Sequence, residues 1–177
     1  MAKHIAFLRA INVGGHNVKM DVLRDLFDGA GFAQVETFIA SGNVIFDSSR
    51  RDTAKLESDI EKMLRSGLGY EVSTFIRSPA EVAAVATHEP FGKRAAGTGL
   101  YVGFMAGRVS SAGRDSILAF RTDVDDFHVH GREVYWQNTG RSSDSKFSNA
   151  TMERALKCRA TFRNITTVTK LAAKYAI

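Results

Sequence analysis

The sequence contains one cysteine, Cys158, and only two prolines. A single cysteine cannot form a disulfide within the chain, which favours a reducing cytoplasm over an oxidising compartment. No apolar run approaches the roughly 20 residues that a membrane-spanning helix needs, and the run Tyr101 to Ala106 is only as long as a strand. The N-terminal segment shows no small-residue cleavage site, so we expect no signal peptide. These absences predict a cytoplasmic protein with no part in the membrane.

The composition is that of a globular protein. Apolar residues make up 44% of the chain and charged residues 24%, which excludes a disordered or fibrous class. A chain of 177 residues is long enough for one large domain or for two small ones that share a core.

The positive charge is concentrated at one end of the chain. Residues 1–130 contain 15 Lys and Arg against 16 Asp and Glu, a net charge of −1, whereas residues 131–177 contain 9 against 3, a net charge of +6. Such an asymmetry is typical of a surface that meets phosphates, on nucleic acid or on a small ligand. A solvated basic helix face would give the same count, so both interpretations stay open.

Alternation and turn signals predict the order β-α-β-β-α-β-α twice. In the first half we expect strands over residues 4–9, 35–39, 43–47 and 70–76, with helices that begin near residues 20, 53 and 79. In the second half we expect strands over residues 100–105, 127–130, 133–136 and 160–162, with helices over 111–120, 146–157 and 165–175. The segment 73–78 and its helix correspond to 160–164 and its helix, which indicates a duplication. The predicted fold is α+β, with tandem duplicated ferredoxin-like (β-α-β-β-α-β) units and antiparallel sheets, over residues 1–90 and 91–177.

Three segments carry a resemblance to a known family. They are Phe7-Leu8-Arg9-Ala10-Ile11-Asn12-Val13-Gly14-Gly15, Ser41-Gly42-Asn43-Val44-Ile45-Phe46 and Thr161-Phe162-Arg163-Asn164-Ile165-Thr166-Thr167-Val168. In this order they resemble the bacterial "domain of unknown function 1697" family, although Ala10 and Ile165 stand where that family usually has glycine and tryptophan. The resemblance implies a tandem ferredoxin-like fold and brings no established activity.

The first candidate site lies where the first strand ends beside the start of the third. This topology gathers an arginine and several polar residues that could orient a small anion, with glycines that let backbone N–H groups approach it. The residues concerned are Arg9, Asn12, Ser41 and Asn43. Turn chemistry alone also explains glycine and asparagine at such positions, and we favour it for the glycines.

The second candidate site lies in the basic C-terminal part, where we expect two helix starts to converge. The residues concerned are Ser145, Lys146, Arg163, Asn164 and Thr167. Hydroxyls there are ordinary helix caps, but cations near a helix N-terminus oppose the helix dipole, which indicates that an anion joins them. An arginine buried against a carboxylate is the competing interpretation.

Other candidates are weaker. His128 and His130 alternate on one strand, but no cysteine or third histidine lies at ligand spacing, so we expect no metal and no cofactor. Cys158 is interpreted as a packed, structural side chain, since a lone helical cysteine usually behaves as a small hydrophobe.

Three hypotheses about function follow. The first is non-enzymatic binding of a phosphate-bearing ligand, either a nucleotide or a nucleic acid. The second is an enzyme acting on a small anionic metabolite. The third is a scaffold whose sheet edge pairs with a partner or with a second copy in a homodimer.

Overall fold

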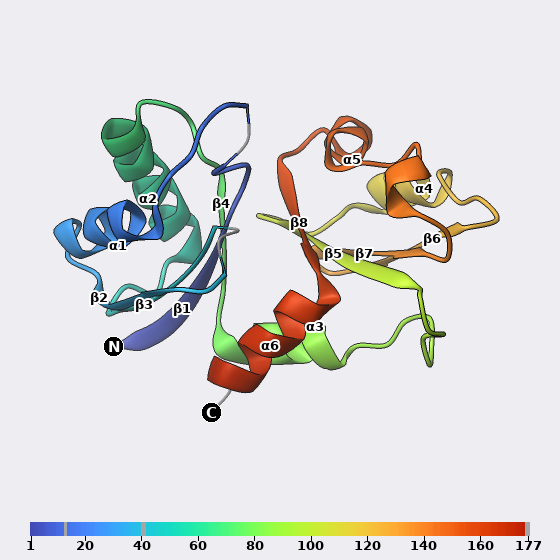
Figure 1. Ribbon diagram of the computed structural model, residues 1–177, viewed down its shortest axis with the longest axis horizontal. Helices are drawn as coiled ribbons and strands as arrows, with labels where there is room; N and C mark the ends of the chain where they lie inside the picture. The colour runs from blue at the N-terminus through green and yellow to red at the C-terminus, as the bar shows by residue number, and fades with distance from the viewer. Residues whose placement is uncertain (13, 40–41, 176–177) are drawn as a thin grey trace. The chain divides into compact units, whose positions relative to one another are not determined.

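The computed structural model describes residues 1–12, 14–39 and 42–175. The chain forms two compact units, Met1–Val82 with Tyr175–Ile177, and Ala83–Lys174. Each unit has its own sheet, and we describe each by itself (Figure 1). Among the described residues, no helix is both long enough and apolar enough to span a bilayer.

The first unit contains one four-stranded antiparallel sheet with strand order β2-β3-β1-β4. Its elements, in chain order, are β1 (Ala2–Leu8), α1 (Met20–Gly29), β2 (Ala33–Thr37), β3 (Asn43–Ser48), α2 (Thr53–Leu68), β4 (Thr74–Arg77) and the start of α3 (Pro79–Thr87). Helices α1 and α2 cover one face of the sheet (Figure 1). Their apolar stripes, which include Leu23, Phe27, Leu56, Ile60 and Leu64, are fully buried there.

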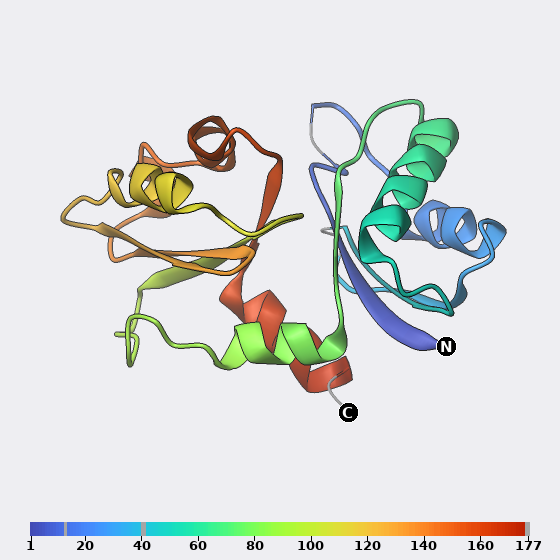
Figure 2. The same ribbon diagram turned by 180° about the vertical axis from the view of Figure 1, so that it is seen from behind.

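The second unit repeats this arrangement, with strand order β6-β7-β5-β8. Its elements are β5 (Gly99–Met105), α4 (Ser111–Leu118), β6 (Asp125–His130), β7 (Glu133–Asn138), α5 (Asn149–Leu156), β8 (Ala160–Asn164) and α6 (Ile165–Tyr175). Helices α4 and α5 lie on one face of the sheet, as the view from behind in Figure 2 also shows. The predicted α+β fold with two ferredoxin-like units is therefore confirmed.

Local sequence explains where several elements begin and end. The Asp52 side chain accepts a hydrogen bond from the Lys55 N–H at 3.0 Å and starts α2, and Gly69 ends the helix in the left-handed region at φ 84°. Ser78 and Glu81 form a reciprocal capping box at the start of α3, with distances of 3.1 and 2.8 Å.

Two carboxylates of α2 reach the β4 edge of the first sheet. Glu57 accepts a hydrogen bond from the Ile76 N–H at 2.8 Å, and Glu61 accepts one from the Thr74 N–H at 2.9 Å. The second unit has an equivalent contact, because Glu153 of α5 accepts a hydrogen bond from the N–H of Ala160 at 2.9 Å. One edge strand of each sheet, β4 in the first and β8 in the second, thus donates backbone hydrogen bonds to glutamate side chains of a helix.

Several details differ from the sequence-based expectation, and two of them concern helix α5 and the residues just after it. Helix α5 begins at Asn149 rather than at Lys146, because Ser148 is the N-cap and accepts a hydrogen bond from the Thr151 N–H at 3.2 Å. Cys158 is exposed just beyond the end of this helix, so its interpretation as a packed core side chain is wrong. Neighbouring protein atoms that keep water from the sulfur, together with the nearby Glu153, nonetheless raise the pKa of the Cys158 thiol.

Candidate functional site

The strand topology brings together the end of β1 and the start of β3, the two segments of the first predicted site. Phe7 at the end of β1 stands opposite Asn43 at the start of β3, and the Leu8 N–H donates to the Gly42 carbonyl at 2.8 Å. Ser41 lies outside the described residues. The end of the first strand and the start of the third are therefore neighbours.

The two asparagines of this edge make hydrogen bonds that shape the backbone. Asn43 is fully buried, and its Nδ2 donates to the Phe38 carbonyl at 2.9 Å. The Oδ1 atom of Asn12 accepts from the Val18 N–H at 2.8 Å. Arg9 is partly buried. These contacts are those of turn chemistry, and the role of these side chains in ligand binding stays a prediction.

In the second predicted site, Arg163 is 8% exposed, and its Nη1 donates to the Thr161 Oγ1 and to the Phe162 carbonyl, each at 2.9 Å. Burial lowers the pKa of Arg163 to about 10. Lys146 is exposed, while the Ser145 hydroxyl donates to the Asp125 carboxylate at 2.9 Å.

The structure separates the two cations of this site. Successive residues of a strand point to opposite faces of its sheet. Phe162 contacts the ring of Phe147, with ring centroids 6.1 Å apart, on the face that α4 and α5 cover. Arg163 therefore points to the other face, away from Phe147 and its neighbour Lys146.

The remaining two predicted residues lie around the start of α6. The Asn164 side chain accepts a hydrogen bond from the Thr166 N–H at 2.9 Å, as a cap does. Thr167 is partly buried one residue further along the helix. This helix start also opens onto a cavity that the sequence did not indicate.

This cavity, which we call the α6 pocket, has a volume of about 550 Å³ and lies within the second unit. Its polar and charged walls include side chains that can bind an anion, and these are His88, Arg94, Gln137, Thr166, Thr169 and Lys170. Glu89 is the carboxylate among the lining residues. Phe91, Leu100 and Ile165 supply apolar surface.

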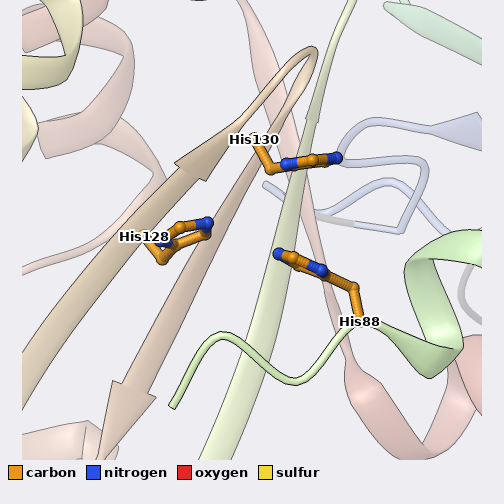
Figure 3. Close-up of side chains that lie close together, drawn as sticks. All are labelled: His88, His128 and His130. Carbon is orange, nitrogen blue, oxygen red and sulfur yellow. The ribbon is translucent and has the colours of Figure 1, made fainter.

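One wall of the α6 pocket is also part of a cluster of three histidines, which we call the histidine cluster. His128 and His130 lie two residues apart on β6, and His88 follows the end of α3. One ring nitrogen of each histidine lies within 4.8 Å of those of the other two. Figure 3 shows the three rings facing one another from these two elements.

The environment of His88 and His128 favours their neutral imidazole forms. Burial lowers the pKa of His88, and the nearby His130 lowers it further. Burial also lowers the pKa of His128, with additional contributions from His88, His130 and Arg114, while Asp126 opposes them. The Nε2 atom of His88 is buried and has no hydrogen-bond partner among the described residues.

Sequence reasoning considered His128 and His130 but missed His88. The alternation in β6 identified the pair, whereas His88 precedes His128 by 40 residues and shows no ligand spacing. Only the folded chain brings the loop after α3 to this strand. The expectation of no metal rested on that missing third ligand.

Taken together, two four-stranded sheets of equivalent strand order define a tandem ferredoxin-like α+β protein. The chain belongs to the family described as "Protein of unknown function (DUF1697)", whose profile matches residues 1–135. This confirms the family resemblance, and the first two of the three sequence segments lie within the matched residues, whereas the third, over residues 161–168, lies beyond them. The family description states no activity.

A solved structure shows the same fold. It is that of the conserved bacterial protein SP0830 from Streptococcus pneumoniae, which matches with a TM-score of 0.74 and 23% identity over 97% of each chain. At this identity the likeness extends to the fold alone. None of the curated proteins compared with the chain matches it.

Proposed function

We propose that the second unit binds a small phosphate-bearing ligand of nucleotide size in the α6 pocket. One observation carries the proposal: Arg94 and Lys170 both line a cavity of about 550 Å³, together with the first turn of α6. Small-molecule sites usually have volumes of roughly 300–1,000 Å³, so the cavity has the size expected for such a ligand.

The chemistry of the walls supports an anion with an apolar or aromatic part. Arginine and lysine supply charge-assisted hydrogen bonds to phosphate oxygens, and the hydroxyls of Thr166 and Thr169 can add neutral ones. Phe91 and Leu100 offer a surface against which a flat ring can pack. The net charge of +6 over residues 131–177 attracts such a ligand to this unit.

Calorimetric titration with AMP and ATP at low salt tests the proposal. A lost charge-assisted contact is worth about 1.5–3 kcal/mol, so Arg94→Ala and Lys170→Ala should each weaken binding roughly tenfold or more. Arg108→Ala removes an exposed arginine that does not line the pocket and serves as the matched control. Unchanged affinity in both pocket variants would refute the site.

Two further measurements locate the ligand if it binds outside the α6 pocket. Lys146→Ala reports on the second site predicted from the sequence, and loss of affinity in that variant alone would place the anion there. An oligonucleotide that bound more tightly than ATP, with a steep salt dependence, would favour a nucleic-acid surface instead.

A second candidate function is an enzyme acting on a small anionic metabolite. It is favoured by His88, which lines the α6 pocket and belongs to the histidine cluster, because histidine commonly transfers protons near neutral pH. Release of inorganic phosphate from the bound nucleotide, lost in His88→Gln, would support the enzyme over simple binding.

A further inference from the structure

The histidine cluster has the ligand types and the arrangement of a metal site. His128 and His130 lie on the same face of β6 because they are two residues apart, and His88 approaches from a separate segment. Tetrahedral coordination at the Zn–N distance of 2.0–2.1 Å requires nitrogen atoms about 3.4 Å apart. The observed separations of up to 4.8 Å come within reach of that value by small side-chain rotations.

A second observation points to a ligand. A buried polar atom is almost always hydrogen-bonded, yet the buried Nε2 atom of His88 has no such partner among the described residues. The His88 ring makes tilted contacts with the other two rings, with its centroid 4.5 Å from that of His130 and 5.3 Å from that of His128. Contacts between rings do not give the Nε2 atom of His88 a polar partner, whereas a metal ion bound to that atom would.

The donor set selects the class of metal. Imidazole nitrogens suit zinc and the other late first-row divalent ions, whereas calcium and magnesium require oxygen ligands. Three protein ligands leave a fourth position for water, as in zinc sites that carry out chemistry. His130 is exposed, which provides a route for the ion from solvent.

We propose that His88, His128 and His130 form a binding site for one Zn²⁺-class metal ion. This site goes beyond the proposed binding of a phosphate ligand. His88 is the only residue that the histidine cluster shares with the lining of the α6 pocket. Because His88 also lines the α6 pocket, a metal held there would add a positive charge to the wall of that pocket.

Protons compete with the metal for the same nitrogen atoms. Two charged groups near the cluster, Arg114 and Asp126, have opposite effects on the pKa of His128. On the neighbouring strand β7, the buried residues Glu133 and Tyr135 stand opposite His130 and His128, respectively. Metal affinity should therefore fall as the pH drops and the imidazoles become protonated.

The test is a calorimetric titration of the chelator-treated, tag-free protein with ZnSO₄ near pH 7.5. We expect one Zn²⁺ per chain and a rise in melting temperature, because the metal binds the folded state. His88→Gln, His128→Gln and His130→Gln should each weaken binding at least about tenfold. Substitution with Co²⁺ should give the intense visible absorption of a tetrahedral site.

His16→Gln is the matched control, since His16 is an exposed histidine that stacks on Tyr70 in the first unit. Circular dichroism establishes that each variant is folded. The proposal is overturned if the wild type binds no Zn²⁺, or if affinity is unchanged in the cluster variants. Loss of Zn²⁺ binding in His128→Gln with normal ATP affinity would separate this site from the proposed phosphate pocket.

Discussion

Arg77 and Arg163 occupy equivalent positions in the two sheets. Arg77 of β4 stands opposite Ile5 of the central strand β1, and Arg163 of β8 stands opposite Val102 of the central strand β5. Both arginines are buried, with 1% and 8% of their surface exposed.

The two arginines also make the same hydrogen bond. Nη1 of each donates, at 2.9 Å, to the carbonyl of the preceding residue, Ile76 in one sheet and Phe162 in the other. The duplication inferred from sequence thus extends to a side-chain contact. A role repeated in both units is the expected behaviour of a structural residue.

We therefore expect Arg163→Ala and Arg77→Ala each to lower the free energy of unfolding by about 2–4 kcal/mol, because removal of a buried guanidinium leaves its acceptors unpaired. Urea denaturation measures this. Arg163→Ala should leave ATP affinity unchanged in the fraction that stays folded. Normal stability combined with lost affinity would instead support Arg163 as the anion ligand that the sequence indicated.

A second prediction concerns the buried carboxylate of Asp125. Its oxygens accept hydrogen bonds from Trp136, Asn138, Ser145 and Thr122 at 2.7–3.2 Å. Asp125→Asn should lower the free energy of unfolding by about 3 kcal/mol, since the charged acceptor is lost inside the fold. Asp123→Asn, a change at an exposed residue just before β6, should have little effect.

The pH dependence of this effect has a definite sign. Burial raises the pKa of Asp125, but the four hydrogen bonds outweigh it and leave the pKa below 3.8. Its stabilising contribution is therefore complete above the unfolded-state value and is lost as the pH falls through the folded-state value. The stability gap between wild type and Asp125→Asn should shrink in acid, and a gap that widens there would contradict the assignment.

A third prediction concerns Gly42, which adopts a φ of 74°. An added Cβ would lie 2.9 Å from the Cγ2 atom of Ile11 and 3.2 Å from the Cβ atom of Leu8. Gly69 has a φ of 84° with open space around it, so Gly69→Ala isolates the backbone cost of about 1 kcal/mol. Gly42→Ala should cost roughly 1–3 kcal/mol more in thermal or urea unfolding. If Gly42→Ala and Gly69→Ala lost equal stability, the atoms of Ile11 and Leu8 would make room for the added Cβ at no cost.

Much of the fold was predictable because hydrophobic periodicity and turn residues are local signals. Helix α6 spans the predicted residues 165–175, and the β6–β7 hairpin turns at Gly131, where φ is 62°. Helix α5 was placed three residues too early because several serines compete as its N-cap. The strand predicted from Tyr70 begins only at Thr74, and Tyr70 lies in the segment before it, where its hydroxyl donates to the Ile11 carbonyl at 2.9 Å.

The candidate site was much less predictable, because it depends on long-range geometry. The α6 pocket joins Arg94 and Lys170, which are 76 residues apart, and no periodicity connects them. His88 likewise meets His128 only in the folded chain. The charge excess pointed to the second unit, but charge counting cannot show which cations share a cavity and which, like Arg163, are buried.

The carboxylates that cover the sheet edges bear on self-association. An exposed edge strand offers unpaired N–H groups on which a foreign strand can add and fibrils can grow. At β4 and β8 those donors at Thr74, Ile76 and Ala160 already bond to helix glutamates. Strand addition there would have to displace an internal acceptor, which directs any intermolecular sheet extension to the opposite edges, β2 and β6.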